Sequence, residues 1–288
     1  MPQDVASWSI PGAEGETILG NTHHPAGGAI GVAILAHGFK GYKDYGLFPP
    51  LARALARHGM LVHRFNFSHS GMTNHIETFE REDLFERDTW NKQVFDLTAV
   101  TNAMAGGEIE GRDLPYVLFG HSRGGVTVLL TAGRHAEDES FPQPSGIITA
   151  AAPSRCNSLS DEDQKTLLEQ GWIVSPSGRT GQQLRVGKGY LQEQLDDSEG
   201  HDLLALASRI RCPVLIVHGT EDDTVSAEHA GLLSDALGER ANVRLIEGGT
   251  HVFNAPNPYP EGQDPPPQLA ELIETTTRFA VSVCERSN

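Results

Sequence analysis

Residues 120–124 read Gly-His-Ser-Arg-Gly and lie between two segments of different pattern. The apolar run 116–119 before them has the composition of a buried strand, and the run 126–130 after them is typical of a helix. A serine held in a sharp strand-to-helix turn needs small residues two places before and after it, and Gly120 and Gly124 stand there. The start of the helix below this serine favours negative charge. The spacing therefore predicts that Ser122 is a nucleophile.

A serine hydroxyl needs a base to accept its proton, and the base needs an acid that fixes its tautomer. Two later segments contain residues of these types, each directly after an apolar run that is typical of a strand. The first is the acidic loop 218–225 (HGTEDDTV), and the second is the segment 247–253 (EGGTHVF). We expect His251 in the second segment to be the base.

Four motifs together resemble those of the α/β-hydrolase superfamily, and the resemblance extends over nearly the whole chain. They are residues 37–39 (HGF), 120–124 (GHSRG), 218–225 (H-G-x-x-D-x-x-V) and 249–251 (GTH). In this superfamily the nucleophile, the acid and the histidine follow one another in that order along the chain. The resemblance implies that Asp222 is the acid, with Asp223 and Glu221 as the alternatives on the same loop.

The resemblance also implies a site for the negative oxygen that forms during acyl transfer. Two backbone N–H groups act as donors in such sites. One belongs to the residue after the nucleophile, Arg123, and the other to Phe39 in the loop that follows the first central strand. Lys40 and Lys43 come next, either as contacts for a polar substrate or as solvated loop charges.

Strand-like and helix-like runs alternate along most of the chain. This alternation predicts an α/β fold, with a mostly parallel sheet that helices cover on both faces and a ligand site at the carboxyl ends of the strands. The expected elements are a hairpin at 5–22, strands at 29–36, 60–65 and 145–151, and helices at 47–57, 90–104 and 268–285.

Residues 154–201 interrupt this alternation, and we expect them to form a lid inserted into a single α/β-hydrolase domain that spans residues 1–288. A helix at 161–170 and a small hairpin over 171–174 and 182–186 are predicted within it. Its large apolar residues are candidates for substrate contact, and packing of the insertion onto the core is the alternative. The candidates for substrate contact are Trp172, Tyr190 and Leu191, together with Val252 next to the predicted base.

Composition narrows the range of partners. A net charge of −16 disfavours nucleic acid and anionic membrane surfaces. Three scattered cysteines indicate reduced thiols, and the first residues lack the pattern of a signal peptide, so we expect a cytoplasmic monomer or homodimer. The histidines lack the paired spacing of a metal site, and no cofactor motif is present, so we expect neither metal nor cofactor.

The sequence thus predicts a serine hydrolase that cleaves a small-molecule carboxylic ester through an acyl-enzyme. The motifs look like those of small bacterial carboxylesterases, including feruloyl (cinnamoyl) esterases, and serine aminopeptidase-like hydrolases share them. The alternatives are an aminopeptidase-like or thioesterase activity and, from another class, a non-catalytic binding protein on the same fold. The presence of a serine, a histidine and an acid in the expected order argues against the last.

Overall fold

The computed structural model describes residues 5–287, and its centre is an eight-stranded sheet. The strand order is β1-β2-β4-β3-β5-β6-β9-β10. The first two strands pair antiparallel, β2 pairs antiparallel with β4, and all later neighbours are parallel. The strands are β1 (Val5–Pro11), β2 (Thr17–His23), β3 (Gly31–Ala36), β4 (Met60–Asn66), β5 (Tyr116–His121), β6 (Gly146–Ala150), β9 (Val214–Gly219) and β10 (Ala241–Ile246).

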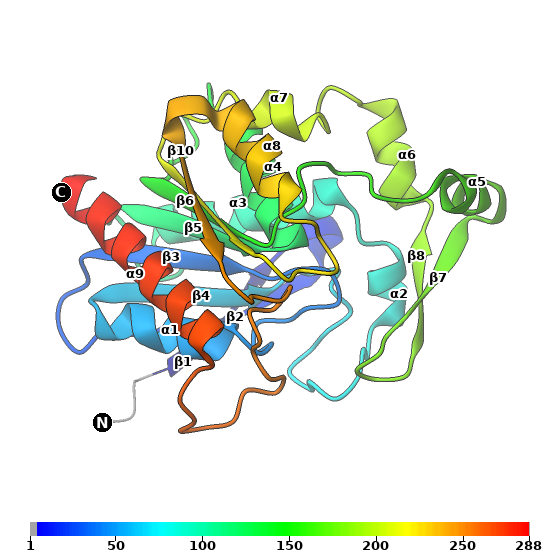
Figure 1. The fold of residues 1–288 in the computed structure, drawn as a ribbon. Helices are drawn as coiled ribbons and strands as arrows, with labels where there is room; N and C mark the ends of the chain where they lie inside the picture. Colours follow the sequence, from blue (N-terminus) through cyan, green and yellow to red (C-terminus); the bar gives the residue numbers. More distant parts are fainter. Residues whose placement is uncertain (1–4, 288) are drawn as a thin grey trace.

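Helices cover both faces of the sheet (Figure 1). The helices α1 (Phe48–Arg57) and α9 (Pro267–Ser287) pack on one face. The helices α3 (Trp90–Gly106), α4 (Arg123–Arg134) and α8 (Glu228–Leu237) pack on the other. The mostly parallel sheet flanked by helices that the sequence predicts is therefore confirmed. Shorter helical elements connect these parts, namely η1 (Ala13–Gly15), α2 (Glu82–Glu86), α7 (Leu203–Ala207) and η2 (Gly238–Arg240).

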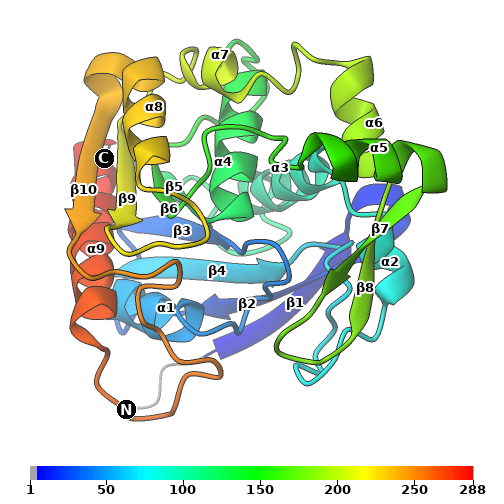
Figure 2. The same cartoon turned by 45° about the vertical axis from the view of Figure 1, so that its right-hand side comes forward.

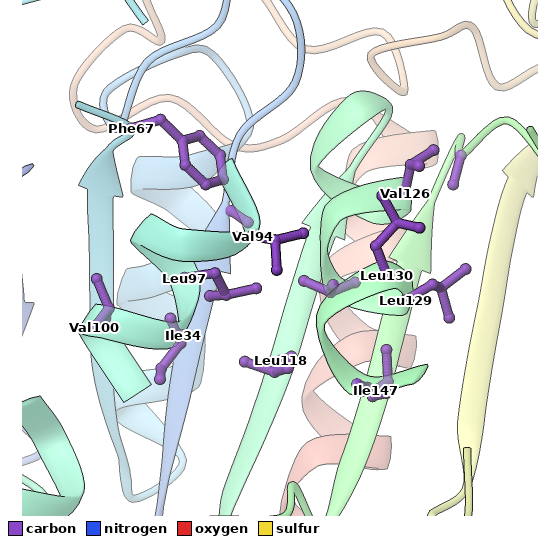
Figure 3. Close-up of a cluster of buried hydrophobic side chains, with 14 of the residues drawn as sticks. Ile34, Phe67, Val94, Leu97, Val100, Leu118, Val126, Leu129, Leu130 and Ile147 are labelled. Atoms are coloured by element: carbon purple, nitrogen blue, oxygen red, sulfur yellow. The ribbon is translucent and has the colours of Figure 1, made fainter. Parts of the chain in front are cut away.

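The central strands are apolar at nearly every position because both faces of the sheet are buried. Successive side chains of a strand point to opposite faces. Ile34, Leu118 and Ile147 therefore lie in the core under α3 and α4, where Figure 3 shows them facing Val94 and Leu97 of α3 and the side chains of α4. Their neighbours along each strand, such as Leu35, Phe119 and Ile148, pack in the core on the α1 and α9 side.

Local sequence signals set the ends of two helices. The Thr89 side chain accepts a hydrogen bond from a backbone N–H in the first turn of α3, and Gly107 ends that helix with a φ of 78°. Ser160 caps α5 (Asp161–Gln170) in the same way, and Gly171 ends it with a φ of 89°. Side-chain oxygens at the N-cap satisfy free N–H groups, and glycine adopts the left-handed conformation without steric cost.

Residues 154–201, called the insertion from here on, leave the sheet after β6 and return before β9. They form α5, a hairpin of β7 (Trp172–Pro176) and β8 (Gln183–Gly187), and α6 (Gly189–Asp196). Figures 1 and 2 show these elements together at one side of the molecule, with the hairpin beside α2. The contact is close, since a Cβ on Gly187 would lie 2.5 Å from the carbonyl oxygen of Glu86. The short helices α2 and α6 were not predicted.

The packing of the core predicts that truncating two leucines will change the free energy of unfolding by different amounts. Leu118 is fully buried at the centre of β5, whereas Leu245 on the edge strand β10 is 48% exposed. We expect Leu118→Ala to lower the free energy of unfolding by about 2–5 kcal/mol, because it removes buried methyl groups and leaves a cavity. Leu245→Ala is the matched control and should change it by about 0.5 kcal/mol or less. Urea denaturation measures both, and equal losses would contradict this account of the core.

Candidate active site

Ser122 lies in the turn between β5 and α4, with a φ of 53° and a ψ of −122°. This backbone conformation is unusual for a residue with a side chain. The turn is tight on both sides, because a Cβ on Gly120 would lie 2.2 Å from the carbonyl oxygen of Gly124, and one on Gly124 would lie 2.4 Å from that of Ala36. The N–H of Ser122 donates to the carbonyl oxygen of Ala150 over 2.8 Å. The two glycines therefore allow the strained turn that presents the serine.

The loops after β9 and β10 bring a histidine and an aspartate to this serine. Oγ of Ser122 lies 3.0 Å from Nε2 of His251. Nδ1 of the same ring lies 2.9 Å from Oδ2 of Asp222. The two loops are tied together, since the N–H of Glu221 donates to the carbonyl oxygen of Gly249 over 2.9 Å. Hydroxyl, imidazole and carboxylate thus form one continuous hydrogen-bonded line.

The structure distinguishes the three acidic residues of the 218–225 loop. The side chain of Asp222 is fully buried, whereas Glu221 and Asp223 are exposed. Besides His251, Asp222 accepts hydrogen bonds from the backbone N–H groups of Thr224 and Val225, both at 2.9 Å. Burial by itself raises the pKa of Asp222, but the hydrogen bonds from His218, His251 and Val225 outweigh it and hold the pKa below its ordinary value. The carboxylate therefore stays ionised at neutral pH.

Three other histidines support the site through backbone contacts. The ring of His121 lies at 5.0 Å from that of His251, and its Nε2 is 2.8 Å from the His251 carbonyl oxygen. Burial lowers the pKa of His121 to about 3, so this ring is neutral. Nε2 of His218 lies 2.9 Å from the carbonyl oxygen of Val225. His37 accepts from the N–H of Phe67 at Nε2, so its Nδ1 carries the proton and donates to Gly38.

The loop after β3 makes a tight turn beside the serine. The N–H of Gly41 donates to the carbonyl oxygen of Gly38 over 3.0 Å, and Lys40 at the third position has a φ of 56°. A Cβ on Gly38 would lie 2.9 Å from Cβ of Ser122, so the loop approaches this serine closely. Among residues 5–287, the backbone N–H groups of Phe39 and Arg123 have no hydrogen-bond acceptor. Both are therefore free to act as donors.

The side chain of Arg123 connects the turn at Ser122 to three aromatic rings. Its guanidinium lies 5.5 Å from the ring of Phe39, 4.6 Å from that of Trp90 and 5.0 Å from that of Tyr190. Nη2 lies 3.2 Å from Oδ2 of Asp88, and the two side chains are 9% and 6% exposed. Sequence reasoning considered only the backbone of Arg123. No local pattern marks this contact, because the rings come from segments far apart in the chain.

A cavity of about 210 Å³ opens beside Ser122. It is formed by the loop after β3, the turn at Ser122, the His251 loop and the turn of the β7–β8 hairpin. Its lining residues are Gly38, Phe39, Lys40, Gly41, Tyr45, Phe48, His121, Ser122, Ser177, Gly178, Arg179, His251 and Val252. The hairpin turn was not expected here, since its residues carry no motif.

Of the four residues predicted to contact substrate, Val252 lines this cavity and the other three lie outside it. Trp172 is half-buried and stacks with the guanidinium of Arg185 at 4.1 Å. Tyr190 is buried, and its hydroxyl donates to the carbonyl oxygen of Cys156 over 2.6 Å. Leu191 is buried and lines a separate groove near α7. These contacts favour the packing alternative for the three residues of the insertion.

Comparison with known proteins identifies the class. A sequence model of the alpha/beta hydrolase family matches residues 33–262, so the chain belongs to this family. A search of curated proteins finds no match.

Two further features are absent within residues 5–287. No helix there is long and apolar enough to cross a membrane. No group of three or more His, Cys, Asp or Glu side chains in the same residues has the geometry of a metal site.

Solved structures share the fold at low sequence identity. A putative hydrolase from Agrobacterium vitis has a TM-score of 0.74 at 17% identity, over 97% of this chain and all (100%) of that one. Est1E from Butyrivibrio proteoclasticus, solved with ferulic acid bound, has a TM-score of 0.70 at 17% identity, over 94% and 97% of the two chains. An esterase domain of a Rhodothermus marinus protein has a TM-score of 0.65 at 21% identity, over 97% and 98%.

The buried pair of Asp88 and Arg123 predicts a pH dependence of stability. Burial raises the pKa of Asp88 to about 6 in spite of the neighbouring guanidinium, so the folded protein binds this proton more tightly than the unfolded chain does. Ionisation of Asp88 therefore costs stability, and we expect the free energy of unfolding to fall as the pH rises from about 4 to 6. Asp88→Asn should weaken this fall because the amide does not ionise, whereas Asp83→Asn, the matched control on a solvated pair with Arg81, should leave it unchanged. Urea denaturation at several pH values measures all three proteins, and an unchanged pH dependence in Asp88→Asn would contradict this account of the buried pair.

Proposed function

We propose that this protein is a serine hydrolase that cleaves a carboxylic ester through an acyl-enzyme. The observation that carries the proposal is the hydrogen-bonded line from Ser122 through His251 to Asp222, with distances of 3.0 Å and 2.9 Å. This line ends at a cavity with two free backbone donors beside it. A binding protein has no need of such an arrangement.

In the first half of the reaction, Oγ of Ser122 attacks the ester carbonyl while Nε2 of His251 takes the hydroxyl proton. The tetrahedral intermediate collapses, the bond to the alcohol oxygen breaks, and His251 returns the proton to the leaving alcohol. Water then attacks the acyl-serine with His251 again as the base, which releases the acid and restores the serine. Asp222 holds the Nδ1–H tautomer and stabilises the imidazolium that forms twice in this cycle.

The N–H groups of Phe39 and Arg123 are the proposed donors to the negative oxygen of the intermediate. Donors that are already oriented cost no reorganisation when charge develops, and one such donor contributes about 3–4 kcal/mol to lowering the barrier. Gly38 supports this role because it lets the loop approach Ser122 closely. His37 holds the same loop through its contact with the Gly38 carbonyl oxygen.

The insertion is proposed to act as a lid within a single catalytic domain. Ser177 and Gly178 of its hairpin turn line the cavity together with Ser122 and His251, which supports this role. A carboxylic ester is the favoured substrate, because an esterase domain and Est1E with bound ferulic acid share the fold. A panel of nitrophenyl esters, acyl thioesters and aminoacyl anilides distinguishes ester hydrolysis from thioesterase and aminopeptidase-like activity.

The proposed nucleophile predicts covalent labelling. A fluorophosphonate probe reacts with a serine that is activated by a base and faces oxyanion donors. We expect stoichiometric labelling of the native protein at Ser122, detected by intact mass and peptide mapping, and none in Ser122→Ala. Ser154→Ala is the matched control, because Ser154 also contacts a histidine, with its Oγ 2.8 Å from Nδ1 of His229. Labelling that survives in Ser122→Ala would place the nucleophile elsewhere.

Substitutions at the two adjacent aspartates should change kcat by very different amounts. Asp222→Asn removes the acceptor that sets the tautomer of His251, and we expect it to lower kcat by about 10⁴, as the corresponding substitution does in a serine protease. Asp223→Asn should change kcat less than about threefold, since Asp223 is exposed and contacts Thr224 rather than the histidine. The measurement is kcat on one nitrophenyl ester, and a larger loss in Asp223→Asn would contradict the assignment.

A further inference from the structure

The cavity beside Ser122 carries positive charge in a strongly acidic protein. Lys40 and Arg179 both line it, and its lining includes no aspartate or glutamate. Asp222 lies behind His251 and is fully buried. The chain as a whole has a net charge of −16, so its overall field repels anions. The charge of the cavity is therefore opposite to that of the molecule around it.

Lys40 is held in the cavity wall by a strained backbone. Its φ of 56° lies in the left-handed region, at the turn position where glycine is the usual residue. Nζ donates to the carbonyl oxygen of Pro176 over 2.7 Å, which ties the loop after β3 to the β7–β8 hairpin. Burial lowers the pKa of Lys40, because its ammonium has lost water without gaining a carboxylate. Strain of this kind persists where the surrounding structure requires it.

Arg179 reaches the cavity from the turn of the hairpin. Its guanidinium lies 4.9 Å from the ring of Tyr42 and 5.3 Å from that of Phe79, and it donates to the carbonyl oxygen of Ile76. Within residues 5–287, neither Arg179 nor Lys40 has a carboxylate oxygen within ion-pair distance. The nearby Asp44 is already paired with Lys43 and Arg64. Both cavity cations are therefore positioned by neutral groups and keep their charge uncompensated.

We propose that the substrate is an ester that carries an anionic group, a carboxylate in the simplest case, and that Lys40 and Arg179 bind this group. The inference rests on the proposed esterase function and names the substrate class of the same site. An ammonium and a guanidinium supply charge-assisted hydrogen bonds to such a group, which are stronger than bonds between neutral partners. The two cations come from different segments, so the anion also holds the hairpin against the loop that bears the Phe39 donor.

Two matched pairs of esters test this proposal and locate the charge. In the first pair, 4-acetoxybenzoate and its methyl ester, the charge is on the alcohol side. In the second, 4-nitrophenyl hydrogen glutarate and 4-nitrophenyl methyl glutarate, it is on the acyl side. For each pair, the ratio of kcat/KM for the anionic ester to that for the neutral ester is measured at pH 7.5. The neutral ester reports any general damage to a variant, since such damage lowers both members alike.

The variants are Lys40→Gln and Arg179→Gln, in which the amide can still donate to the backbone carbonyls that hold these side chains. We expect the ratio to fall about tenfold in each variant for at least one pair, as lost contact with a charged group weakens binding in the transition state. Lys188→Gln is the matched control, because Lys188 is an exposed cation of the insertion outside the cavity, and it should leave the ratio unchanged.

An unchanged ratio for both pairs in both variants overturns the anion preference while leaving the esterase function intact. The failure of the proposed function has a different signature. If Ser122→Ala keeps the hydrolysis of all four esters, Ser122 is not the nucleophile, and the substrate class proposed for its cavity falls with it. A tenfold fall for only one pair supports the proposal and assigns the anion to the acyl or to the alcohol side.

Discussion

The close packing of backbone at the turn that holds Ser122 is the constraint on which the rest of the site depends. Ser122 keeps a positive φ because β5, α4 and the end of β3 approach one another without intervening side chains at Gly120 and Gly124. A Cβ on Gly124 would lie 2.4 Å from the carbonyl oxygen of Ala36, so any larger residue would push α4 away from the sheet. The loop after β3 also comes close to the serine, since a Cβ on Gly38 would lie 2.9 Å from Cβ of Ser122.

Once the serine is fixed in this way, the parallel sheet brings the remaining groups to it. The carboxyl ends of parallel strands meet at one edge, and the Asp222 and His251 loops follow the neighbouring strands β9 and β10. Close approach of backbone also joins these loops, because a Cβ on Gly219 would lie 2.1 Å from the carbonyl oxygen of Gly249. The aspartate is then held by backbone N–H groups as well as by the histidine, so its orientation does not depend on solvent.

Charged side chains around the turn at Ser122 determine the electrostatics of this site. The Arg123 guanidinium lies among the rings of Phe39, Trp90 and Tyr190, so it connects the turn at Ser122 with the loop after β3, with α3 and with α6 of the insertion. Burial of this cation and of Asp88 costs desolvation energy, which their mutual contact, the ring faces and the hydrogen bond from Gln93 to Asp88 offset. Lys40 and Arg179 give the cavity its positive charge, and they come from the loop after β3 and the hairpin turn rather than from the turn at Ser122.

The sequence by itself determined the strands and helices of the fold and the position of the turn at Ser122. The apolar strands, the helix periodicity and the glycines around Ser122 are local patterns, and each has a local physical cause that can be read without coordinates. The resemblance to the α/β-hydrolase superfamily added the order of a serine, an acid of the 218–225 loop and His251. Only the tertiary structure decided which groups meet across long separations. It separated Asp222 from Asp223 and Glu221 by distance to His251, placed Arg179 and Ser177 on the cavity, and placed Trp172, Tyr190 and Leu191 in packing contacts outside it. The last two outcomes depend on where the insertion lies relative to the loop after β3 and to α2, and that position is set by many contacts between distant segments rather than by any one motif.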